Sequence, residues 1–148
     1  MPLPLTTRNA KDVFDELKLQ GAWVQEYAQQ VSSSASFSAK VLEALLTSVS
    51  TLLTNANAVK VDTALSANLV AYIQQISGST TVQADFDASL AALAPLQTAI
   101  IAEYPKDSAG HPLDRSIDAN GNITPIAITA AQIPNTLAAI TTWLATVQ

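Results

Sequence analysis

Residues 119–148 read ANGNITPIAITAAQIPNTLAAITTWLATVQ and contain no charged side chain. A charge-free run of this length is typical of either a membrane span or a segment buried against protein. A spanning helix needs about 20 predominantly apolar residues, whereas Pro125 and Pro134 interrupt this run and many Thr, Asn and Gln residues dilute it. The stretch therefore argues against a membrane span and predicts burial, against the rest of the chain or against a partner.

The second half of this stretch predicts an amphipathic helix that begins at about Thr129 or Pro134. Its apolar residues repeat as in an a/d seam, which requires a partner helix. Its polar face carries Thr, Asn, Gln and Ala instead of Lys and Glu, so we expect a neighbouring protein to cover part of that face. The candidate interface residues are those of the seam, Ile133, Leu137, Ile140, Leu144 and Val147, together with Trp143 beside it and Ile123 and Ile126 before it.

Apolar residues at helical spacing predict four further helices upstream. These helices are expected at about Thr7–Val31, Ser36–Thr54, within Ala58–Ser77, and from Val82 to Tyr104. The second is apolar around much of its circumference, which is typical of a central helix in a bundle. Gly21 lies inside the first helix, where glycine costs about 1 kcal/mol relative to alanine, and it predicts the close approach of another backbone.

Three signals predict how the third and fourth helices end and begin. Gly78 is well placed to end the third helix. Thr80–Gln83 has the spacing of a capping box for the fourth. Pro95 removes a backbone donor and clashes one turn back, so a kink or break is expected near Ala91–Ala94.

The segment 105–128 differs from the rest of the chain and is rich in proline and glycine. Asn120-Gly121 is a strong hairpin signal, with Arg115–Asp118 and Asn122–Ile126 as the two short strands. The sequence therefore predicts an all-α fold. We expect residues 1–148 to form a single domain, an antiparallel bundle of four to five helices with this irregular loop or hairpin before the last one.

Composition excludes several classes of function. The net charge of −5 and the scattered Lys and Arg residues argue against a nucleic-acid partner, which needs clustered basic residues. The chain has no cysteine, so disulfides and thiolate chemistry are excluded. Charged residues make up 13% of the chain against about 25% in an average globular protein, and such a weakly charged surface favours packing against protein. The N-terminal residues lack the pattern of a signal peptide.

Catalytic, cofactor and metal sites are not predicted. His111 is the single histidine, and its place in a loop favours a solvated side chain over a catalytic base. Zinc and di-iron sites need more histidine, cysteine or Glu-x-x-His ligands than the sequence holds. Asp118–Ile123 resembles the middle of an EF-hand loop, but the bidentate glutamate is missing. An Asn-Gly turn in which Asp118 binds its own backbone is the favoured interpretation.

These features favour a non-enzymatic structural or assembly protein that self-associates. Two binding alternatives stay open. The wide apolar helix faces could line a cavity for a lipid or another apolar ligand, and a surface adhesion or toxin-like module is a further hypothesis. An enzyme is disfavoured.

A resemblance to a known class of proteins favours the structural or assembly role over the binding alternatives. The residues Ala102–Asp107, Leu113–Ser116 and Ile123–Pro125, followed by the closing amphipathic helix, resemble small helical virion proteins of tailed bacteriophages. This resemblance covers roughly the last third of the chain. It implies a multi-copy capsid, neck or tail component that contacts itself or other virion proteins. The implied location is the virion, and outside a phage it is the cytoplasm.

Overall fold

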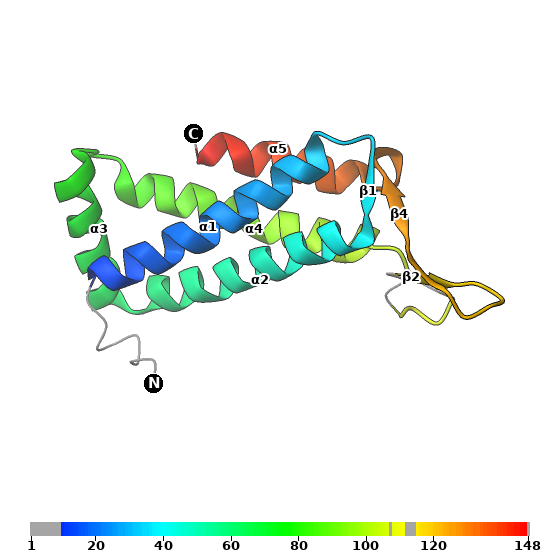
Figure 1. Cartoon of the computed structure of the whole chain (residues 1–148). Coiled ribbons are helices and arrows are strands. Elements are labelled where there is room, and N and C mark those ends of the chain that lie inside the picture. Colours follow the sequence, from blue (N-terminus) through cyan, green and yellow to red (C-terminus); the bar gives the residue numbers. More distant parts are fainter. Residues whose placement is uncertain (1–9, 107, 112–114, 148) are drawn as a thin grey trace.

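The computed structural model describes residues 10–106, 108–111 and 115–147 and shows a helical bundle with two small antiparallel sheets (Figure 1). The helices are α1 (Ala10–Ser32), α2 (Ala39–Val61), α3 (Thr63–Ser77), α4 (Val82–Glu103) and α5 (Pro134–Thr146). Helices α1, α2, α4 and α5 run lengthwise and alternate in direction, whereas α3 lies across one end. The predicted all-α fold is confirmed. The expected start of the first helix at Thr7 lies outside the described residues.

Helix α2 is central, as its broad apolar surface predicts. Leu42, Leu45 and Val49 are fully buried along it, and it contacts α1, α3 and α4. Burial of each such side chain stabilises the fold by about 1.5–3 kcal/mol relative to exposure. The core between these helices is the main source of stability.

The boundary between the second and third helices was predicted wrongly. Helix α2 continues to Val61, and α3 begins only at Thr63. Asp62 separates them because its carboxylate Oδ1 accepts the backbone N–H of Leu65 at 3.1 Å. This is the role of an N-cap aspartate, so the sequence held a signal for this boundary.

The expected start of the second helix at Ser36 was also wrong. Ser36–Ser38 forms strand β1, which pairs antiparallel with β4 (Ala127–Thr129), and Phe37 lies opposite Ile128. The pairing continues beyond the strands, because Ala39 N–H donates to the Ile126 carbonyl at 2.7 Å. The helix therefore begins one residue after Ser38, whose hydroxyl caps it by accepting the Lys40 N–H at 3.2 Å.

Helix α4 runs without interruption through Pro95, so the expected break does not occur. The predicted capping box at Thr80–Gln83 is also wrong. Thr81 is the N-cap residue and makes no side-chain cap; its hydroxyl donates instead to the Asp85 carboxylate at 2.9 Å. Gly78 ends α3 as predicted, in the left-handed conformation (φ 72°).

The predicted hairpin forms from β2 (Arg115–Ile117) and β3 (Ile123–Pro125) and extends beyond the end of the bundle opposite α3 (orange in Figure 1). Asp118 holds its turn by accepting the backbone N–H groups of Asn120 and Asn122, each at 2.9 Å. Gly121 supplies the positive φ of 82° that the turn requires. The favoured interpretation of Asp118–Asn122 as an Asx-type turn is thus confirmed.

Helix α5 follows a short 3₁₀ turn, η2 (Ala130–Gln132), and packs mainly on α4 with a further contact to α1. Its first turn is capped by Glu103, whose carboxylate accepts the backbone N–H groups of Asn135 at 3.0 Å and Thr136 at 2.5 Å. None of the helices in the described residues combines the length and the hydropathy that a membrane span requires.

Candidate functional site

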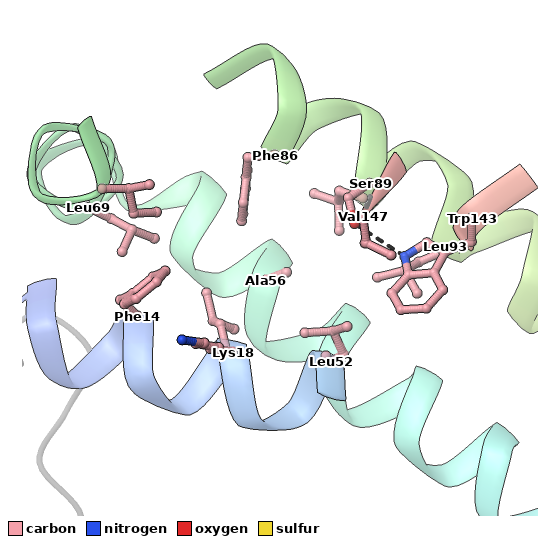
Figure 2. Close-up of a pocket in the computed structure, with 14 residues that line it drawn as sticks. Phe14, Lys18, Leu52, Ala56, Leu69, Phe86, Ser89, Leu93, Trp143 and Val147 are labelled. Atoms are coloured by element: carbon pink, nitrogen blue, oxygen red, sulfur yellow. Dashed lines mark hydrogen bonds between the residues drawn. The ribbon is translucent and has the colours of Figure 1, made fainter. Parts of the chain in front are cut away.

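An apolar cavity of about 240 Å³ opens between the helices, near the end of the bundle that α3 covers (Figure 2). All five helices contribute to its wall, because α3 lies across the ends of the others. The wall includes Leu52 and Ala56 from α2, Leu69 from α3, Phe86 and Leu93 from α4 and Trp143 from α5. These groups offer shape and apolar contact to a ligand but no catalytic chemistry.

Helix α1 contributes one face to the cavity, formed by residues at helical spacing: Phe14, Leu17, Lys18 and Gly21. Lys18 is the one charged side chain among the described lining residues. Its ammonium lies 5.8 Å from the centre of the Phe14 ring, and within the described part of the chain it forms no ion pair. The side chain is exposed, which places a cation at the rim of an apolar space.

Gly21 faces open space, which corrects the expectation that another backbone approaches it. A Cβ atom built at this position meets no atom within 4 Å, and its φ lies outside the positive range that favours glycine. Neither packing nor backbone conformation therefore requires glycine here. The residue leaves the wall of the cavity open at a point where most side chains would fill it.

The wall has two uncharged polar side chains, Trp143 and Ser89, and they are hydrogen-bonded to each other. The Trp143 indole Nε1–H donates to the Ser89 hydroxyl at 3.2 Å, and Trp143 is 1% exposed. This hydrogen bond joins α5 to α4 beside the cavity (Figure 2) and fixes the orientation of the indole. Apart from the Lys18 ammonium at the rim, the rest of the described wall presents hydrocarbon, which would hold an occupant by apolar contact.

The β2–β3 hairpin, which extends beyond the end of the bundle, carries two exposed isoleucines (Figure 1). Ile117 and Ile123 lie directly opposite each other across β2 and β3 and are 66% and 61% exposed. Directly opposite side chains in an antiparallel pair lie on one face of the ribbon, so the two isoleucines form an apolar patch. The β2–β3 hairpin with this patch is called the arm below.

A second surface feature is a shallow groove of about 440 Å³ between α1 and α2. Trp23, which is 47% exposed, and Tyr27 form its α1 side, and Ala44, Thr47 and Ser48 form its α2 side. At its edge Lys40 and Glu43 pair at 3.4 Å, which leaves that edge with little net charge. This is called the aromatic groove below.

The predicted interface residues divide into three groups. Ile133, Ile140 and Trp143 are buried in the chain's own core, so the helix seam docks on α4 of the same chain. Leu137, Leu144 and Ile126 are partly buried against that core. Val147, which is 39% exposed and lines the cavity, and Ile123 in the arm are open to solvent.

The residues weighed for chemistry do not line the cavity, and Asp118 lies in the turn of the arm, next to Ile117. His111 is exposed in the loop before the arm. Hydrogen bonds from Asn122 and from the Asn120 N–H hold the pKa of Asp118 below its usual value. The described residues contain no group of three or more His, Cys, Asp or Glu side chains placed to hold a metal ion.

The cavity was not predicted residue by residue, because five separate helices supply its wall. The wide apolar helix faces raised a cavity only as a general alternative, and Gly21, a glycine inside a helix, was interpreted as a packing contact. No protein-family model, curated protein or solved structure matches this chain.

Proposed function

We propose that this chain is a non-enzymatic assembly subunit that associates with further copies of itself through the arm. In the setting implied by the resemblance to phage virion proteins, it would be a multi-copy component of a capsid, neck or tail. The observation that carries the proposal is the exposed pair Ile117 and Ile123, held in register beyond the end of the bundle.

The arm is held by its own hydrogen bonds, and its two isoleucines stay mostly exposed within the chain. Asp118 and Gly121 fix the turn, and the register places both isoleucines on one face. Preorganisation of this kind reduces the entropy lost on association. Two isoleucines left in water on a rigid ribbon are typical of a contact completed by a partner.

The aromatic groove of a second copy offers a surface on which the arm can dock. Trp23 and Tyr27 present aromatic surface, which is enriched in protein interfaces, and the Lys40–Glu43 pair leaves little net charge to oppose docking. Insertion of one subunit's arm into another's groove is a head-to-tail contact. Such contacts generate rings or filaments, as a multi-copy particle component requires.

The outer face of α5 supports the same proposal. Its exposed positions are uncharged: Pro134, Asn135, Ala138, Thr141, Thr142 and Ala145. Covering such a face requires little removal of ionic hydration. We expect it to be partly covered in the assembly.

Light scattering on the purified chain over a range of concentrations tests the proposal. The wild type is expected to form a defined oligomer or a growing series. The double variant Ile117→Ser/Ile123→Ser, and separately Trp23→Ser, are expected to shift the mass towards the monomer while the helical circular dichroism is unchanged. Because α5 supplies core residues, deletion of residues 129–148 would unfold the chain and is not a usable variant.

Ile76→Ser is the matched control, because Ile76 is 54% exposed on α3 and belongs to neither the arm nor the aromatic groove. It is expected to keep the wild-type mass. A wild-type chain that stays monomeric at every concentration would overturn the proposal of self-association. An oligomer unaffected by the arm variant would overturn the role of the arm.

A further inference from the structure

Independently of the assembly role, we infer that the cavity between the helices binds the alkyl chain of a single-chain carboxylate, with the carboxylate at the Lys18 ammonium. Three features of the described residues point to this ligand class. They are the size and hydrocarbon character of the space, the single cation at its rim, and the open wall at Gly21.

The volume fits one chain of medium length. The cavity measures about 240 Å³. An engineered cavity of about 150 Å³ holds benzene, and pockets for drug-sized ligands measure about 300–1,000 Å³. The space is therefore larger than a benzene-sized ligand needs and too small for a two-chain phospholipid.

The charge at the rim selects the headgroup. Lys18 is exposed, lies on the face of α1 that lines the cavity, and has no ion-pair partner within the described part of the chain. An anionic headgroup would remain in partial contact with water while its chain enters the apolar space. A cationic headgroup would be repelled and a neutral one would gain no ion pair.

Gly21 supports a binding site independently of the cavity volume and of Lys18. A glycine inside a helix destabilises it relative to alanine, and here nothing within 4 Å of the missing Cβ accounts for it. Its effect is to keep the cavity open on the α1 side, three residues from Lys18. Space kept at the expense of helix stability is the pattern expected of a binding site.

Isothermal titration calorimetry of the full chain with decanoate, below its micelle concentration, tests the inference. Decanoate is expected to bind with one site per chain, decanol more weakly, and decylamine more weakly still. Trp143 provides a second readout, because it lines the cavity and Trp23 does not. In a Trp23→Phe chain, decanoate is expected to change the Trp143 fluorescence in parallel with the heat.

Two variants probe the two features separately. Lys18→Met is expected to weaken decanoate binding about fivefold, the factor for one partly exposed ion pair, and to leave decanol binding unchanged. Gly21→Leu is expected to weaken both ligands about tenfold or more, because each methylene excluded from the cavity forfeits about fourfold in affinity.

Matched controls lie on the same helix. Lys11→Met removes a cation that is already paired with Asp15 at 2.9 Å and is expected to leave binding unchanged. Ala22→Leu adds the same bulk at an exposed neighbouring position that does not line the cavity, and it is also expected to leave binding unchanged. Absence of decanoate binding to the wild type overturns the inference. Equal binding of decanoate and decylamine overturns the role of Lys18, and wild-type affinity in a folded Gly21→Leu chain overturns the location, as does unchanged Trp143 fluorescence.

Discussion

Glu103 at the end of α4 caps the first turn of α5 by accepting the backbone N–H of Thr136 at 2.5 Å. Its second carboxylate oxygen accepts the Asn135 N–H at 3.0 Å. Pro134 and Ile133 precede these residues and offer no side-chain cap, so a residue distant in sequence does what a local N-cap residue ordinarily does. The negative charge also complements the positive end of the α5 dipole.

Replacing this carboxylate is expected to loosen the attachment of α5. Glu103→Gln keeps one acceptor but removes the charge, and should lower the free energy of unfolding by about 1 kcal/mol at neutral pH. Urea denaturation followed by circular dichroism measures this. Glu43→Gln removes a carboxylate from an exposed pair with Lys40 and should change stability by less than about 0.5 kcal/mol. Equal effects of the two variants would contradict the cap.

The same carboxylate predicts a pH dependence. Partial burial alone would raise the pKa of Glu103, but hydrogen bonds from Thr136 and Asn135 outweigh burial and hold the pKa below the ordinary 4.5. A carboxyl group with a lowered folded-state pKa stabilises fully above its unfolded pKa, and this stabilisation is lost as the pH falls through the folded value. The stability gap between wild type and Glu103→Gln should therefore be constant from pH 7 to about 5 and shrink below about pH 4. A gap independent of pH down to 3 would contradict this.

Local signals in the sequence were sufficient for elements that depend on residues close together in the chain. Helical periodicity identified α1, α2, α3, α4 and α5, and Asn120-Gly121 identified the arm. Strand β1 was missed because it depends on a residue far away in the sequence. Phe37 is extended because it pairs with Ile128. The cap at α5 was missed for the same reason, since nothing local links Glu103 to Thr136.

The candidate sites were less predictable than the fold. Apolar spacing marked Ile140 and Trp143 as residues that must dock, but it could not decide between a partner and the chain's own α4. The cavity depends on how five helices meet, which periodicity does not specify. The exposed isoleucines of the arm depend on register, because a shift of one residue reverses the face of each side chain.

The contribution of the β1–β4 sheet can be measured by comparing two isoleucines in strands that follow each other in the chain but belong to different sheets. Ile128 in β4 is fully buried and Ile123 in β3 is 61% exposed. Ile128→Ala should lower the free energy of unfolding by about 2–5 kcal/mol, and Ile123→Ala by less than about 0.5 kcal/mol. Urea unfolding at a concentration where the chain is monomeric makes the comparison independent of assembly. A small effect of Ile128→Ala would show that the sheet does not anchor the start of α2.

Gly21 gives a prediction in the stabilising direction. Because alanine fits without contact at this position, Gly21→Ala should raise the free energy of unfolding by about 1 kcal/mol through helix propensity alone. Gly78→Ala is the control in the opposite direction. Gly78 ends α3 at a φ of 72°, where a Cβ is strained, so the variant should lower the free energy of unfolding by about 1 kcal/mol. Thermal and urea unfolding would show both changes. If Gly21→Ala failed to stabilise the chain, the glycine would have a structural role after all, and its place in the cavity wall would no longer argue for a ligand.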